Sequence, residues 1–285
     1  MRGSDPGSGA PLADTIRAAM SIETRLIRRA LVGVVAFFLA ADCARASTEA
    51  QWSLRLGAGR AASRDTVLAD TGCLSTAPPA LFGCGVGIDG RPFSAAGDFG
   101  RGTLGEIAIG ARLSPSLRLE VAALALRGFE LDANANFPRV GAVQPVTAKL
   151  DSEALLAIVS WEPAATFGWN LGRLAPFVSA GIGGARHHLG AVTFGFPGIS
   201  GRAVTVTRGG SETEGAWLLG IGAGIAVSRH ATLEVALRRL DLGGAETEAG
   251  LATIVRPSRT FTLRVAAIRA PVRVDALTVG LRLTR

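Results

Sequence analysis

The sequence predicts an all-β fold, an antiparallel up-and-down β-barrel that crosses a membrane with eight strands. The mean hydropathy is +0.34 over 285 residues, which is high for a soluble domain. No apolar run reaches the ~20 residues that a membrane helix needs. The apolar residues instead alternate with small or polar ones in short segments, and a period of two is typical of strands with one apolar face. A transmembrane barrel combines these features.

Residues 1–46 are predicted to be an N-terminal extension and a secretory signal peptide, with Met20 as an alternative start. A basic segment precedes an apolar stretch at residues 30–41, and Ala44-Arg45-Ala46 has the small-residue pattern of a cleavage site. This order is that of a signal peptide, and an N-terminal anchor helix is the alternative. Cleavage after Ala46 leaves residues 47–285 as one barrel domain.

Eight segments of the mature chain have the strand pattern. They are Gln51–Ala61, Thr103–Leu113, Leu117–Arg127, Ser152–Glu162, Ala175–Leu189, Gly215–Ser228, Thr232–Gly243 and Val272–Arg285. Long connections alternate with short ones, and the long ones are 62–102, 128–151, 190–214 and 244–271. Outer-membrane barrels have short periplasmic turns and long extracellular loops, so we expect these four connections to face the outside. An even number of strands places both ends of the barrel on the periplasmic side.

Strand parity predicts a network of charged side chains inside the barrel. The inward residues are Arg55, Glu106, Arg112, Arg118, Glu120, Glu234, Arg238 and Arg282. Eight strands leave an interior just wide enough for side chains, and an unpaired buried charge is costly. We therefore expect ion pairs that fill the lumen and allow at most a small, intermittent conductance. A salt-bridge gate for ions, in a narrow porin-like channel, is the alternative.

Cysteine usage fits export. Cys43 leaves with the signal peptide, and the mature chain keeps Cys73 and Cys84. In an oxidising compartment we expect these two residues to form a disulfide in the first long extracellular loop, with two free thiols as the alternative.

Four stretches resemble the family of small eight-stranded outer-membrane barrels, which includes the OmpA-like transmembrane domain and porin-family or opacity-protein barrels. They are residues 175–184, 215–224, 233–239 and 275–283. The resemblance implies an integral protein of the outer membrane of a Gram-negative cell, with a structural or surface-interaction role. It also implies contact with outer-membrane lipid and with the barrel assembly machinery, and the long loops as a site for an extracellular ligand. The family usually ends in an aromatic residue, whereas this chain ends in Arg285, which bears on its assembly.

The sequence favours neither an enzyme nor a metal, cofactor or nucleic-acid site. The arginines that give the net charge of +7 are scattered singly, whereas a nucleic-acid site would group them with aromatic residues. His187 and His188 point to opposite faces of a strand, which is poor geometry for a metal, and we expect both to be solvated residues at the rim. Two further classes of protein remain open: a barrel enzyme that acts on lipid, which would need Ser, His and an acid near the extracellular rim, and a soluble secreted barrel of the lipocalin type.

Overall fold

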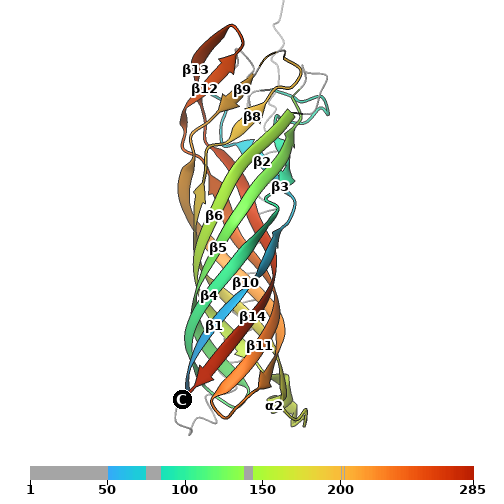
Figure 1. Ribbon diagram of the computed structural model, residues 1–285, viewed down its shortest axis with the longest axis vertical. Coiled ribbons are helices and arrows are strands. Elements are labelled where there is room, and N and C mark those ends of the chain that lie inside the picture. The colour runs from blue at the N-terminus through green and yellow to red at the C-terminus, as the bar shows by residue number, and fades with distance from the viewer. Residues whose placement is uncertain (1–50, 75–84, 138–143, 200, 202) are drawn as a thin grey trace, which may run out of the picture. The chain divides into compact units, whose positions relative to one another are not determined.

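Eight long antiparallel strands close into a barrel in the computed structural model, which describes residues 51–74, 85–137, 144–199, 201 and 203–285 (Figure 1). The strands of the ring are β1 (Gln51–Ser63), β4 (Arg101–Arg112), β5 (Leu117–Ala135), β6 (Gln144–Trp161), β7 (Leu174–Leu189), β10 (Gly210–Ala226), β11 (Ala231–Glu246) and β14 (Ile268–Thr284). Each pairs with the next, and β1 pairs with β14, for example Leu56 with Leu281, which closes the ring. The predicted eight-stranded barrel is confirmed. The predicted signal peptide and its cleavage site lie outside the described residues.

The short connections lie together at one end of the barrel, which we call the periplasmic end. One is the turn around Ser114–Ser116, one contains the five-residue helix α2 (Pro163–Phe167), and one is the turn at 227–230. Figure 1 shows α2 and the C-terminus at this end. Within the described residues no helix has the length and apolar character to cross a membrane.

The long connections are more regular than the sequence suggested, because they form a second tier of sheet at the extracellular end (Figure 1). Its short strands are β2 (Thr66–Asp70), β3 (Ala95–Asp98), β8 (Thr193–Gly195), β9 (Val204–Val206), β12 (Gly250–Arg256) and β13 (Arg259–Val265). They pair with the extended ends of β5, β6 and β14 and with one another. We call this part of the barrel the upper tier. The predicted loops 62–102, 128–151, 190–214 and 244–271 therefore contribute strands as well as turns.

Two β-bulges lie between the upper tier and the rest of the barrel, which we call the lower barrel. One shifts the register of β5 between Leu126 and Phe129, and the other shifts β11 between Asp241 and Gly244. Each contains a glycine with positive φ, Gly128 at 77° and Gly243 at 84°, a conformation that other residues rarely adopt. The extra residue reverses the strand parity, so that Leu124 and Leu126 face inward below the bulge and Phe129 and Leu131 face inward above it.

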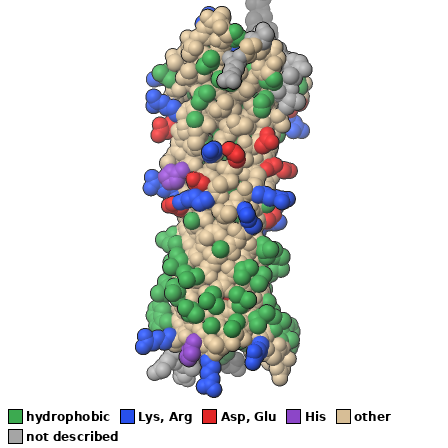
Figure 2. Space-filling model, in the orientation of Figure 1, with side chains coloured by type: hydrophobic (Ala, Val, Ile, Leu, Met, Phe, Trp, Pro, Cys, Tyr) green, Lys and Arg blue, Asp and Glu red, His purple; other side chains and the backbone are tan. Residues whose placement is uncertain are grey.

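A belt of exposed apolar side chains surrounds the lower barrel (Figure 2). We call it the apolar belt, and its larger members are Trp52, Leu54, Leu56, Ile107, Ile109, Leu119, Val121, Leu155, Val178, Ile182, Leu219, Ile221, Leu233, Val235, Leu237, Leu277, Val279, Leu281 and Leu283. Along β14 the belt begins at Leu283 and gives way to charge at Asp275. A strand rises about 3.4 Å per residue, so eight residues of a strand tilted by about 40° span roughly 20 Å along the barrel axis. This is close to the apolar height of ~25 Å in transmembrane barrels.

Charged side chains form a ring on the outer wall immediately above the apolar belt (Figure 2). We call it the charged girdle, and it contains Arg60, Arg127, Glu153, Arg186, Arg239, Asp241, Arg273 and Asp275. Several members pair across strands: Arg239 with Asp275 at 2.8 Å, Arg273 with Asp241 at 3.1 Å, and Arg127 with Glu153. Such residues prefer water and lipid headgroups to hydrocarbon, so the girdle marks the outer edge of the membrane-spanning part.

Above the girdle the polarity of the barrel is reversed, with polar residues outside and apolar residues inside. In β5 and β6 the outward residues of the upper tier are polar, such as Glu130, Asp132 and Lys149, whereas Leu131, Val146 and Leu150 point inward and are buried. The upper tier thus has an apolar core like that of a soluble barrel, and the lower barrel has an apolar exterior. Two architectures that the sequence presented as alternatives, membrane barrel and soluble barrel, are stacked in one molecule.

Candidate functional site

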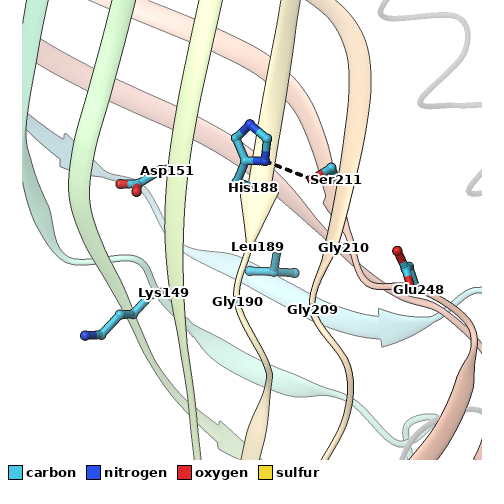
Figure 3. A pocket seen from close by; sticks show the side chains of 9 residues that line it. All are labelled: Lys149, Asp151, His188, Leu189, Gly190, Gly209, Gly210, Ser211 and Glu248. Atoms are coloured by element: carbon cyan, nitrogen blue, oxygen red, sulfur yellow. Dashed lines mark hydrogen bonds between the residues drawn. The ribbon is translucent and has the colours of Figure 1, made fainter.

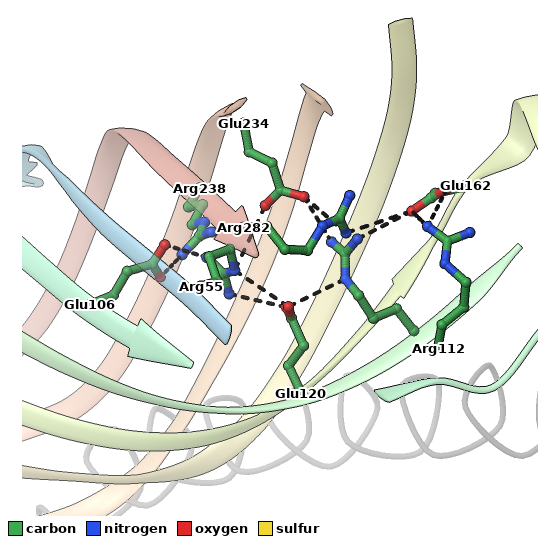
Figure 4. Close-up of polar contacts among 9 residues, drawn as sticks. Arg55, Glu106, Arg112, Glu120, Glu162, Glu234, Arg238 and Arg282 are labelled. Carbon is green, nitrogen blue, oxygen red and sulfur yellow. Dashed lines mark hydrogen bonds and ion pairs between the residues drawn. The ribbon is translucent and has the colours of Figure 1, made fainter. Parts of the chain in front are cut away.

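The charged residues of the lower barrel meet in its lumen (Figure 4). Arg55 on β1 is central, because its guanidinium contacts Glu106 on β4, Glu120 on β5 at 3.1 Å and Glu234 on β11 at 3.7 Å. Glu106 also pairs with Arg238 of β11. All five side chains are 5% exposed or less. Three carboxylates from opposite sides of the ring therefore converge on one guanidinium, and the barrel is bridged across its diameter.

A second group continues the network toward the periplasmic end. Arg118 contacts Glu120 at 3.3 Å, Glu234 at 3.3 Å and Glu162 at 3.2 Å. Arg282 of β14 lies 3.0 Å from Glu234 and 3.8 Å from Glu162. With Arg112 and Glu162 included, the network contains five arginines and four glutamates. Each carboxylate contacts at least two arginines.

Seven of the eight residues expected in the lumen are buried there, and Arg112 differs. Its side chain is 31% exposed at the end of β4, where it pairs with Glu162 at 2.9 Å and donates to the carbonyl of Pro115 at 2.6 Å. Arg112 therefore lies at the periplasmic mouth, because β4 ends at this residue.

Glu162 is the network member that sequence reasoning missed. It follows the last residue of β6 and is 7% exposed. The signal was present, because Ser152, Ala154, Leu156, Ile158 and Ser160 are the inward residues of β6 and Glu162 continues their parity. What the sequence did not show is that one carboxylate here is shared by Arg112, Arg118 and Arg282.

Small and aromatic residues of the neighbouring strands make room for the network. A Cβ atom on Gly57 would lie 2.7 Å from a carboxylate oxygen of Glu106, so a larger residue there would displace that side chain. Phe177 of β7 lies under the Arg118 guanidinium, which is 5.7 Å from the ring centroid. A cation over an aromatic face is attracted to it, which helps to hold an arginine away from water.

An apolar section fills the lumen directly above the charges. On each strand a leucine lies on the extracellular side of a charged residue: Leu104 above Glu106, Leu126 above Glu120, and Leu240 above Arg238. These leucines, with Leu156, Leu218 and Leu242, are at most 1% exposed. The sequence predicted a lumen filled by ion pairs, whereas the structure shows a charged section and an apolar section in series.

His187 lies inside the barrel, which corrects the expectation of a solvated rim residue. It is 0% exposed, its Nε2 donates to the carbonyl of Leu242 at 2.9 Å, and its Nδ1 is 2.8 Å from the Ser152 hydroxyl. The expectation was wrong because the predicted strand leaves the barrel at this point, whereas in the structure the barrel continues above it as the upper tier. His188 points outward and is exposed, as expected.

The predicted disulfide lies only partly within the described residues. Cys73 follows β2 and is disulfide-bonded, and Cys84 lies outside the described residues. The pairing of these two cysteines stays a prediction. Within the described ranges no group of three or more His, Cys, Asp or Glu side chains is arranged to hold a metal ion.

A polar depression lies on the outer wall at the extracellular side of the girdle (Figure 3). Its volume is about 430 Å³, and its polar side chains come from β6, β7, β10 and the segment after β11. They are Lys149, Asp151, His188, Ser211 and Glu248. His188 Nδ1 lies 2.8 Å from Ser211 Oγ. The grouping of Asp151, His188 and Ser211 is not visible in the sequence, because the three residues lie in three separate segments.

No family model and no curated protein matches the chain. Solved structures with a similar fold include Neisserial surface protein A, at 13% identity and a TM-score of 0.43 over 83% of this chain and 99% of that one. The outer-membrane protease OmpT from Escherichia coli has 11% identity and a TM-score of 0.43 over 84% of this chain and 99% of that one. The outer-membrane protein OprG from Pseudomonas aeruginosa has 14% identity and a TM-score of 0.43 over 82% and 96%. The likeness concerns the fold.

Proposed function

We propose that this chain is an integral outer-membrane protein with a closed lumen, whose role is structural and surface-directed rather than ion-conducting. The proposal rests on the apolar section of the lumen, where Leu218, Leu240 and Leu242 have no exposed surface. An ion that crossed this section would lose its hydration without gaining a polar partner, which is very costly. The charged section below adds ion pairs that an ion would have to break.

The outer wall supports the placement in the membrane. The apolar belt has the height of an outer-membrane barrel, and the charged girdle ends it on the extracellular side. Interfacial aromatic residues lie at the other end, where Phe167 of α2 packs between Trp161 and Trp169 with centroid distances of 6.1 and 5.2 Å. Aromatic side chains with a polar edge prefer this boundary between hydrocarbon and water.

The upper tier is the part that supports a surface role. It raises a folded sheet above the girdle, and its β12–β13 hairpin exposes residues such as Leu251, Thr262 and Arg264. A sheet with its own apolar core holds such residues in fixed positions, which reduces the entropy that a binding partner would have to overcome. An extracellular ligand would meet this tier first.

Single-channel recording tests the closed lumen. Purified protein in a planar bilayer should show no steady conductance. The variant Glu120→Ala, which disrupts the charged section, should also remain closed because the apolar section is unchanged. A large, steady conductance in the unmutated protein would contradict the proposal, and a conductance that appears only in Glu120→Ala would assign the seal to the charges.

A further inference from the structure

Three side chains with the chemistry of a nucleophilic site stand in one row on the outer wall. The strand register places Asp151 of β6 directly opposite His188 of β7, and His188 directly opposite Ser211 of β10. The sequence separates them by 37 and 23 residues, so only the barrel brings them together. Figure 3 shows the His188 ring beside Ser211, with Asp151 on the other neighbouring strand.

The contact between Ser211 and His188 has the geometry of a hydroxyl activated by a base. Ser211 Oγ lies 2.8 Å from His188 Nδ1, within the 2.6–3.2 Å or so that a general base needs to take a proton. When Nδ1 is the unprotonated nitrogen, the hydroxyl donates its hydrogen to it. Both residues are exposed, so a substrate can approach the oxygen.

Charged side chains of both signs lie around the depression, but they point away from the Ser211–His188 pair (Figure 3). Asp151 accepts a hydrogen bond from the Gly128 amide of β5 at 3.2 Å, so its carboxylate points away from His188, which lies on the other side of β6 (Figure 3). Lys149, the only lysine of the chain, lines the same depression, and its ammonium points away from Ser211 (Figure 3). The site therefore rests on the contact between Ser211 and His188.

The position of the depression indicates the kind of substrate. His188 is the next outward residue after Arg186 of the charged girdle, which ends the apolar belt. Asp151 lies at the same level, because it is two residues from Glu153 of the girdle on the extracellular side. A lipid whose acyl chains cover the belt would carry its headgroup, and the ester bonds that join the two, near this level.

We propose that Ser211 and His188 form an acyl-transfer site that cleaves ester-linked acyl chains of outer-leaflet lipid. Ser211 Oγ attacks the ester carbonyl carbon while His188 Nδ1 takes the hydroxyl proton, and the same proton passes to the alcohol oxygen that leaves. Water then attacks the acyl-serine and gives a proton to His188. The carboxylic acid departs as the proton returns to Ser211 Oγ, so the site is restored with one ester and one water consumed.

The chain provides its own matched control at the periplasmic turn. Ser228 and His230 are also exposed and close in space, but their contact runs from the His230 backbone amide to Ser228 Oγ at 3.2 Å. The His230 ring instead lies 3.3 Å from the carbonyl of Thr284. This pair has the same residue types without a hydroxyl bonded to an imidazole, so it should be inert.

The test uses the full chain folded in detergent micelles and a fluorescent fluorophosphonate, a probe that labels activated serines. We expect labelling at Ser211, located by mass spectrometry of the labelled peptide. Ser211→Ala should abolish it, His188→Gln should slow it by about 100-fold, and Ser228→Ala and His230→Gln should leave it unchanged. Heat-modifiable migration on a gel verifies that each variant is folded.

A second measurement identifies the lipid. Release of free fatty acid from vesicles of phosphatidylethanolamine, and separately from vesicles that contain lipopolysaccharide, should depend on Ser211 in at least one of the two. Labelling that is no faster than in heat-unfolded protein, or that survives Ser211→Ala, would overturn the proposal, as would a lack of Ser211-dependent release from both vesicles. None of these results bears on conductance, so this inference and the closed lumen can fail independently.

Discussion

Glu120 lies between two arginines in the barrel interior, 3.1 Å from Arg55 and 3.3 Å from Arg118. Its side chain is 2% exposed, so water does not replace a lost partner. Removal of one partner from a buried ion pair costs about 3–5 kcal/mol because it leaves a charge uncompensated. We expect Glu120→Ala to lower the free energy of unfolding by about this amount, measured by urea titration in lipid vesicles.

Glu153 is the matched control for this measurement. It also pairs with an arginine, Arg127, but both side chains are about half exposed on the outer wall. Water and salt screen such a pair, so Glu153→Ala should leave the unfolding midpoint nearly unchanged. Equal effects of Glu120→Ala and Glu153→Ala would mean that the lumen is hydrated.

Asp70, at the end of β2 in the upper tier, predicts a pH dependence. Burial raises the pKa of its carboxyl from 3.8 to about 7, and its Oδ1 has no hydrogen-bond partner among the described residues. The folded state therefore binds a proton more tightly than the unfolded state. The stability from this group is complete below about pH 4 and is lost as the pH rises through about 7.

Hydrogen exchange of the β2 amides, residues 66–70, measures this effect after correction for the intrinsic exchange rate. Protection should fall between pH 5.5 and pH 8 in the unmutated protein and should remain constant in Asp70→Asn. Asp65→Asn, which changes an exposed carboxylate on the same segment, should keep the pH dependence. Loss of protection with pH in Asp70→Asn would show that another group is responsible.

At the scale of an element, β14 crosses the membrane with one face to lipid and the other to the lumen. Leu277, Val279, Leu281 and Leu283 are exposed, and the residues between them are buried. An arginine on the lipid face costs about 2–4 kcal/mol at the bilayer midplane and less near the interfaces. We expect Leu281→Arg to lower the free energy of unfolding in vesicles within this range.

Leu251 of β12 provides a control with a similar exposed fraction. It is 52% exposed and Leu281 is 42% exposed, but Leu251 belongs to the upper tier. Leu251→Arg should therefore have almost no effect, because its side chain already faces water. If both substitutions were equally harmless, the apolar belt would not contact lipid.

The whole molecule predicts a topology in which the upper tier lies outside the cell. We expect a cysteine placed at Thr262 of β13 to react with a membrane-impermeant maleimide on intact cells. A cysteine at Ser228, in a periplasmic turn, should react only after the outer membrane is permeabilised. Both positions are exposed, so accessibility and not burial decides the result. If only the Ser228→Cys variant were labelled on intact cells, the barrel would have the opposite orientation in the membrane.

The sequence by itself determined the fold class, the number of strands in the ring and most of the inward charges. These features depend on alternation within one strand, as in the row Leu277, Val279, Leu281 and Leu283, and period-two alternation can be read locally. Two predicted strands ended at Arg127 and Gly243 because the alternation breaks there. The structure shows that the breaks are bulges and that β5 and β11 continue beyond them.

Only the tertiary structure decided what depends on contacts between strands. It showed Glu162 shared by three arginines, His187 enclosed by the extended barrel, and Asp151, His188 and Ser211 in one row. The physical reason is register: a shift of one residue moves every side chain of a strand to the other face, and bulges create such shifts. Because pairing between distant segments sets the register, the sequence of one strand fixes which residues share a face but not which residues of other strands they meet.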